Sequence, residues 1–350
     1  MRADNNFNLI RLLAATQVLV VHGLNHLEYG GVLVDLRKLV PGVPVFFFVS
    51  GMLITASYER LSVRQNGLRK FIVNRLLRIY PALWVCVLFS LLVVWLTGYF
   101  ETQSFSLTQL MFWVFGQLTF LQFYNPEFMR GFGVGVLNGA LWTIAVELQF
   151  YVLTPVLVWL LMRRRSWFVV ALLASMAINI WLRLAYDWSD IRIKLLSVSF
   201  LPWVYMFMIG ALTQVYRHRL SVLLSGLGCW RWVTLLIAYL ASMVLIGNVV
   251  DNSSNSIHPL AFLLLCALVF HLSTAKLFIS KHAIEFFQRN DYSYGIYIFH
   301  TPVLNVTLYL GFLNAEPNWQ LLWINLIPML LAALSWHIIE KRALGFKGRL

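Results

Sequence analysis

The residues that could do chemistry are few, because most of the chain is apolar. Arg11 and His22 lie in the first apolar stretch, and Glu147 is the only acid well inside any apolar stretch that we expect to cross a membrane. A charged side chain in such a helix costs several kcal/mol, so each is a candidate functional residue. Arg11 and His22 share one helix face about 16 Å apart, because their separation corresponds to three turns plus about 20°. The two side chains would line the same path through the membrane at two different depths.

A histidine beside a carboxylate can act as a general base, because the carboxylate fixes the tautomer and stabilises the imidazolium that forms. We therefore expect His22 and Glu147 to be catalytic partners. Structural alternatives remain open: a snorkelling Arg11, a His22 that bridges helices, or an inert buried His22–Glu147 pair. His26 lies one turn after His22, but no third ligand is evident, so we expect no metal site.

Two further groups are candidates for binding substrate. The stretch YSYGIYIFH at 292–300 contains Tyr297 and His300, although a lone histidine there could equally hold helices together. The stretch NRLLRIYP at 74–81 puts Arg75 and Arg78 one turn apart, with Tyr80 and Pro81 marking the expected start of a helix. Paired guanidinium groups match phosphate geometry, but such arginines can also serve only to orient a membrane helix.

The elements that position these residues must be membrane helices. The 350 residues are 60% hydrophobic and only 12% charged, against roughly 25% charged in an average soluble domain. Apolar stretches near bilayer length recur throughout, so we expect one transmembrane domain over 1–350 and no separate soluble domain. The 27 Lys and Arg against 14 Asp and Glu sit in short clusters between these stretches. That pattern indicates contact with lipid or an anionic substrate, not with nucleic acid.

We predict an all-α integral membrane protein with about ten transmembrane helices. The expected spans are roughly 8–27, 39–57, 79–99, 140–162, 167–186, 195–216, 233–250, 257–273, 294–313 and 318–339. Basic residues in the loop after the second span place that loop and both termini in the cytoplasm if 108–124 does not cross. We therefore expect 108–124 to be interfacial or re-entrant, and 274–290 to be a cytoplasmic amphipathic helix. In this orientation Glu147 lies about 10 Å and His22 about 8 Å below the outer ends of their helices, so they can meet.

Four stretches, in this order, resemble the acyltransferase 3 family of bacterial membrane O-acyltransferases. They are Arg11 and His22 in the first span; FFFVSG at 46–51 with NRLLRIYP; LWTIAVELQFY at 141–151; and YSYGIYIFH followed by IEKR at 339–342. By position, His22 resembles the family's catalytic histidine, Arg11 its companion, and Arg75 with Arg78 the acyl-CoA-binding pair. Thr143 departs from the serine common in the family.

The resemblance implies transfer of an acyl group, acetyl by default, from acyl-CoA to a hydroxyl of a surface glycan or lipid-linked sugar at the bacterial inner membrane. Trp142 and Ser50 are candidate donors to the oxyanion, and direct transfer and an acyl-histidine intermediate both remain open. We expect no permanently bound cofactor, and the oligomeric state is open. The alternatives are a secondary transporter or flippase, for which we see no inverted repeat, and a structural scaffold, which would not need buried Arg11, His22 and Glu147.

Overall fold

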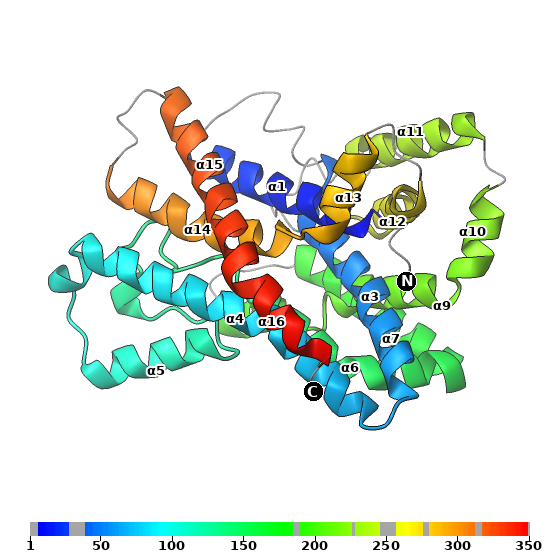
Figure 1. Ribbon diagram of the computed structural model, residues 1–350, viewed down its shortest axis with the longest axis horizontal. Coiled ribbons are helices and arrows are strands. Elements are labelled where there is room, and N and C mark those ends of the chain that lie inside the picture. The colour runs from blue at the N-terminus through cyan, green and yellow to red at the C-terminus, as the bar shows by residue number, and fades with distance from the viewer. Residues whose placement is uncertain are drawn as a thin grey trace. The chain divides into compact units, whose positions relative to one another are not determined.

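The computed structural model describes residues 6–27, 39–184, 190–225, 228–245, 257–275, 280–311 and 317–348. Throughout these ranges the ordered elements are helices, and no strand occurs among them (Figure 1). The chain forms two compact units, each assembled from separate segments. Unit 1 comprises 1–17, 35–71 and 149–291, and unit 2 comprises 18–34, 72–148 and 292–350.

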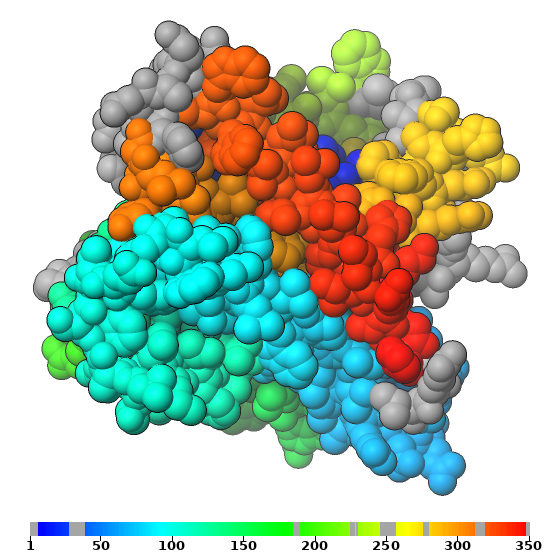
Figure 2. All heavy atoms as spheres, turned by 60° about the vertical axis from the view of Figure 1, so that its left-hand side comes forward, coloured from blue at the N-terminus to red at the C-terminus, as the bar shows by residue number. Residues whose placement is uncertain are grey.

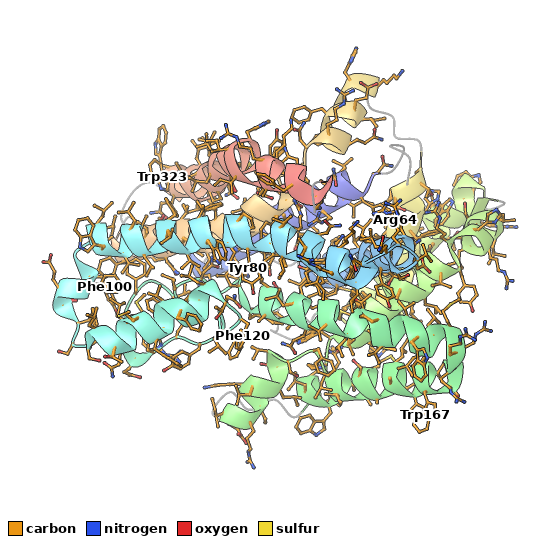
Figure 3. All side chains as sticks on the ribbon, turned by 60° about the horizontal axis from the view of Figure 1, so that its bottom comes forward. Arg64, Tyr80, Phe100, Phe120, Trp167 and Trp323 are labelled. Atoms are coloured by element: carbon orange, nitrogen blue, oxygen red, sulfur yellow. The ribbon has the colours of Figure 1, made fainter. Side chains whose placement is uncertain are left out.

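Within the described residues, six helical segments are long and apolar enough to cross a membrane. They are Phe7–His26, Gly42–Ser62, Gly67–Leu96, Gly139–Arg163, Arg165–Leu184 and Trp319–Gly345. Large aromatic side chains point away from the helices, among them Phe120, Trp167 and Trp323 (Figure 3). Trp167, for example, is 65% exposed, which suits a lipid-facing surface. The chain is thus a membrane protein with several apolar helices, while the count of ten spans and the cytoplasmic termini remain predictions.

The helix that carries Arg75 and Arg78 begins earlier than expected. Helix α4 runs from Gly67 to Leu96, with Pro81 in its interior, so Tyr80 and Pro81 do not mark its start. An interior proline removes one backbone hydrogen bond, but neighbouring groups make this tolerable in membrane helices. The helix therefore continues through Pro81. Both arginines consequently lie inside a helix of 30 residues.

The expected span 195–216 is wrong as a continuous helix. Helix α8, Ile191–Ser197, ends well before helix α9, Val204–Val215, begins. The hydroxyls of Ser197 and Ser199 donate to backbone carbonyls three residues earlier, at 2.7 and 2.8 Å. Such local bonds compete with the helical ladder, and Pro202 disfavours helical geometry in the residue before it. These features break the apolar run into two short helices.

The two segments expected outside the bilayer core are short helices. Helix α5, Leu107–Leu118, ends before 124, and its 12 residues span only about 18 Å, too short to cross alone. Helix α13, Lys281–Arg289, is amphipathic and begins later than the expected residue 274, which is the last residue of α12, Pro259–Thr274. The membrane side on which each lies is still a prediction.

Unit 1 is built around a close contact between α3, Gly42–Ser62, and α9. A Cβ added at Gly51 would lie 2.1 Å from the backbone oxygen of Phe207, and one added at Gly210 would lie 2.1 Å from that of Phe48. The two backbones can approach this closely only because both positions lack a side chain. The other helices of unit 1 are α7 (Arg165–Leu184), α8, α10 (Arg217–Ser225), α11 (Cys229–Leu245), α12 and α13, together with parts of α1 (Phe7–His26), α4 and α6 (Trp142–Arg163).

Gly51→Ala is expected to destabilise the protein by about 1 to 3 kcal/mol or more, because the new methyl group would overlap backbone that a rotamer change cannot move. Thermal unfolding in detergent measures the effect. Gly345→Ala is the matched control, since nothing lies within 4 Å of a Cβ there. Equal unfolding temperatures for the two variants would contradict the close α3–α9 contact.

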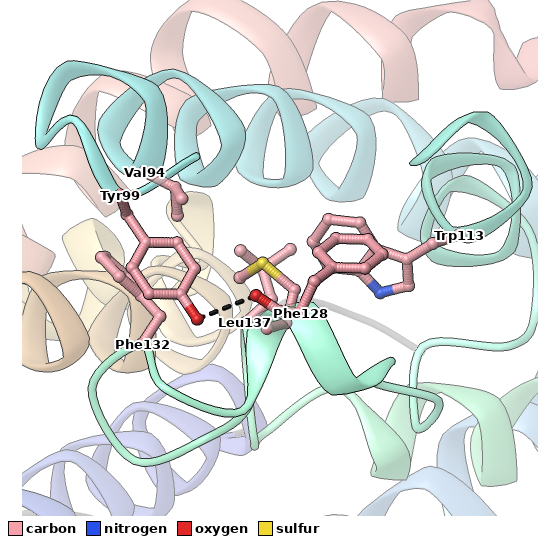
Figure 4. Packing of buried hydrophobic residues seen from close by; sticks show 7 residues of the cluster. Val94, Tyr99, Trp113, Phe128, Phe132 and Leu137 are labelled. Atoms are coloured by element: carbon pink, nitrogen blue, oxygen red, sulfur yellow. Dashed lines mark hydrogen bonds between the residues drawn. The ribbon is translucent and has the colours of Figure 1, made fainter. Parts of the chain in front are cut away.

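Unit 2 contains an aromatic cluster that holds the Gly-rich loop 131–139. Its buried members are Val94, Tyr99, Trp113, Phe128, Met129, Phe132 and Leu137 (Figure 4). The Tyr99 hydroxyl donates to the Phe128 carbonyl at 2.8 Å and accepts from the Gly131 amide at 3.1 Å. The end of α4 and the segment containing α5 lie side by side on one face of this unit (Figure 2). The loop is therefore an ordered part of unit 2.

Candidate active site

The centre of the candidate site is a pair of histidines in unit 2. Nδ1 of His22, on α1, lies 2.8 Å from Nε2 of His300, on α14 (Ser293–Tyr309). The ring centroids are 5.0 Å apart. His300 is 1% exposed, whereas His22 is half-buried. His22 is thus hydrogen-bonded to a second histidine, whereas from the sequence we expected Glu147 as its partner.

The backbone and neighbouring side chains of α14 hold His300 in turn. Its Nδ1 lies 2.7 Å from the Tyr297 carbonyl oxygen, and its Nε2 lies 3.2 Å from the Thr301 hydroxyl. The Tyr297 hydroxyl lies 2.7 Å from Oγ1 of Thr143 and donates to the Ala140 carbonyl at 3.1 Å. Tyr297 therefore joins α14 to the start of α6, and Thr143 supplies a hydroxyl where serine would do the same.

Glu147 and Trp142 lie on this first part of α6, within unit 2. Glu147 is half-buried. Trp142 is also half-buried. Tyr297, which is hydrogen-bonded to Thr143 on this part of α6, has its ring centroid 6.0 Å from that of His300.

The Gly-rich loop is fixed to α14 by Asn305. The Asn305 side chain accepts from the Val134 amide at 3.0 Å and donates to the Val136 and Leu137 carbonyls at 2.7 and 3.0 Å. Gly133 has φ +55° and lies so close that a Cβ would be 2.7 Å from Cα of Asn305. This contact requires glycine at 133, and it places the loop against the helix that carries His300.

Arg78 is held within unit 2 by a buried ion pair. Its Nη1 lies 3.2 Å from Oε2 of Glu340, and the guanidinium lies over the Tyr294 and Trp336 rings, 5.7 and 5.9 Å from their centroids. Glu340 is 2% exposed, and its Oε1 accepts from the Ser335 hydroxyl at 3.1 Å. It belongs to a π-helical turn, Trp336–Glu340, between α15 (Pro317–Ser335) and α16 (Lys341–Gly345). Glu147 is therefore not the only acid inside a spanning segment, because the last span extends beyond 339.

Arg11 is also paired, in unit 1. Its Nη1 donates to Oδ2 of Asp291, just before α14. Near it the Asn8 side chain donates to the Phe287 and Gln288 carbonyls at 3.0 and 3.1 Å. This arrangement ties the first half of α1 to the end of α13. Arg11 thus has an acidic partner, Asp291, that we did not predict from the sequence.

The partners Asp291, Glu340 and Asn305 were missed, although two of them adjoin stretches with recognised patterns. Asp291 precedes YSYGIYIFH, and Glu340 lies in IEKR. In both cases the sequence places an acidic residue at the edge of an apolar stretch, where it could have been considered as a partner for an arginine in another stretch. Asn305 had no such signal. Within the described ranges no group of three or more His, Cys, Asp or Glu side chains is placed to hold a metal ion, and His26 is exposed.

Comparisons with known proteins identify the family of the chain. A family model described as an acyltransferase domain matches residues 4–339. A nodulation protein 10 of Rhizobium leguminosarum bv. viciae is 32% identical over 98% of this chain and 94% of its own length. An O-acetyl transferase of Shigella phage Sf6 is 27% identical over 98% of this chain and 97% of its own length.

A more distant relative is longer. The O-acetyltransferase OatA of Staphylococcus aureus is 24% identical over 87% of this chain, which covers 53% of that protein. No solved structure matches the chain. The family match spans nearly all the helices and both histidines of the central pair, so this chain belongs to the acyltransferase 3 family of enzymes.

Proposed function

We propose that the protein transfers an acyl group, acetyl by default, from acyl-CoA to a hydroxyl of a surface glycan or lipid-linked sugar. The observation that carries this proposal is the His22–His300 hydrogen bond inside an acyltransferase chain. A half-buried imidazole with a defined partner is suited to general-base catalysis. The names of the phage and staphylococcal relatives support acetyl as the group transferred. We place the enzyme in the bacterial inner membrane, with both termini cytoplasmic.

In the proposed reaction His22 takes the proton of the acceptor hydroxyl. The hydroxyl oxygen attacks the thioester carbonyl, a C–O bond forms, the C–S bond breaks, and the coenzyme A thiolate leaves with the proton from His22. Glu147 stabilises the positive charge that develops on the imidazole, and Trp142 donates to the oxyanion. Tyr297 positions the first turn of α6 through Thr143. An acyl-histidine intermediate on His22 would give the same products by two steps.

The donor phosphates are proposed to bind near the arginines of α4. Arg75 is half-buried and lies one turn before Arg78, which Glu340 holds in place. A planar guanidinium can bind phosphate oxygens through two donors at once. Arg75 is therefore the primary phosphate ligand in this scheme, and Arg78 is positioned beside it.

Arg75→Ala is expected to weaken acyl-CoA binding by about 1.5 to 3 kcal/mol, the contribution of a hydrogen bond to a charged group. Arg75→Lys should recover only part of the affinity, because an ammonium cannot bind bidentately. Titration of acyl-CoA into the detergent-solubilised protein measures both. Arg64→Ala is the control, since Arg64 is exposed in the turn before α4 (Figure 3). Unchanged affinity in Arg75→Ala would remove the phosphate site from this helix.

Incubation of the purified protein with labelled acetyl-CoA tests the enzyme class. We expect free coenzyme A to be released faster when an acceptor glycan is present. A transporter or flippase would leave the thioester intact. Intact acetyl-CoA under all acceptor conditions would overturn the proposed donor.

A further inference from the structure

A chain of hydrogen bonds runs from the backbone of α14 to the ring of His22. The Tyr297 carbonyl oxygen lies 2.7 Å from Nδ1 of His300, and Nε2 of His300 lies 2.8 Å from Nδ1 of His22. A carbonyl oxygen can only accept a hydrogen bond, so Nδ1 of His300 must carry a proton. The first proton in the chain is thereby assigned.

The position of the second proton, on His22, follows from that of the first, on His300. With Nδ1 protonated, the neutral His300 ring has a lone pair on Nε2, which is then an acceptor. Nδ1 of His22 must consequently donate to it, and the remaining nitrogen of His22, Nε2, carries the free lone pair. The alternative is a doubly protonated His300. The His300 side chain is only 1% exposed, so this imidazolium would be a charge buried among neutral groups, which is costly.

We infer that His300 is a positioning residue that holds His22 in the tautomer whose Nε2 is the general base. This inference rests on the proposed function. When Nε2 of His22 takes the hydroxyl proton, the imidazolium still donates through Nδ1 to the neutral ring of His300. His300 thus takes the place usually held by a carboxylate in such a relay, without introducing a second buried charge. The carboxylate of Glu147 acts from a different position and need not bind His22 directly.

His300→Leu tests this inference because leucine removes the acceptor while keeping an apolar side chain. We expect kcat to fall by about 10²-fold or more with the KM for acetyl-CoA and acceptor unchanged, since an incorrectly oriented tautomer impairs the chemical step and not binding. In His300→Gln the amide oxygen can take the place of Nε2 and accept from His22, so part of kcat should return. Thr307→Val is the matched control for lost polarity, because Thr307 is buried on the same helix and its hydroxyl donates to the Val303 carbonyl at 2.9 Å.

The double variant with His22 separates positioning from structure. If His300 acts through His22, adding His300→Leu to His22→Gln should not lower the residual rate further. Independent losses in the double variant, or no recovery in a folded His300→Gln, would overturn the inference. So would an unchanged kcat in His300→Leu while His22→Gln is inactive, and that result would leave the proposed function standing. Failure of the parent protein to use acetyl-CoA would instead refute the proposed function.

Discussion

His22→Gln is expected to lower the rate of acyl transfer by about 10²- to 10⁴-fold while the protein folds and expresses normally. Glutamine keeps a hydrogen-bonding group near His300 but cannot accept a proton at neutral pH. A role in holding α1 to α14 would therefore be partly preserved, whereas a role as base would be lost. Release of coenzyme A and acylation of the acceptor, measured on purified protein, report the rate.

His26→Gln is the matched control for this variant. His26 lies one turn further along α1, is exposed, and has its ring centroid 6.3 Å from that of His22. We expect it to transfer acyl groups at close to the parent rate. If His22→Gln were as active as His26→Gln, His22 would be a bridge between helices and the mechanism would be wrong.

Arg78→Ala is expected to destabilise the protein by about 3 to 5 kcal/mol, because it leaves the Glu340 carboxylate buried without its ion-pair partner. The side chains of Arg78 and Glu340 are 12% and 2% exposed, so solvent screens the pair little. The loss of contact with the Tyr294 and Trp336 rings adds to the effect. Thermal or denaturant unfolding in detergent measures it. An arginine that served only to orient the helix would give a much smaller loss.

A second substitution distinguishes the ion pair from general damage to α4. Arg78→Ala combined with Glu340→Ala removes both charges, and the double variant should be more stable than Arg78→Ala alone. If the two losses simply added, the ion pair would not account for the destabilisation. Arg75→Ala provides the comparison one turn away, where we expect the main effect on donor affinity.

Much of the fold could be predicted from the sequence because apolar length and charge placement determine where membrane helices form. The helices α1, α3, α6 and α7 lie close to the expected spans. His22 and His300 stood out because ionisable side chains in such helices are costly without a purpose.

Helix boundaries failed where local chemistry competed with the apolar pattern. Pro81 suggested a start, yet α4 passes through it, whereas Pro202 and two serine hydroxyls interrupt an equally apolar run. A proline alone does not decide between these outcomes.

The partners of the site residues could not be predicted because they are far away in the sequence. His22 and His300 are 278 positions apart, Arg78 and Glu340 are 262 apart, and Arg11 and Asp291 are 280 apart. The expected depth of a residue in the bilayer does not show which helices are neighbours. That limit is why the partner of His22 was expected to be Glu147 and is His300.

The mass of the surface polysaccharide tests the central claim most directly. The gene is deleted, and the strain is then complemented with the parent gene or with the His22→Gln gene. We predict that deletion removes one acetyl unit per modified sugar, that the parent gene restores it, and that the His22→Gln gene does not. Restoration by His22→Gln, or glycans of the same mass with and without the gene, would contradict the account.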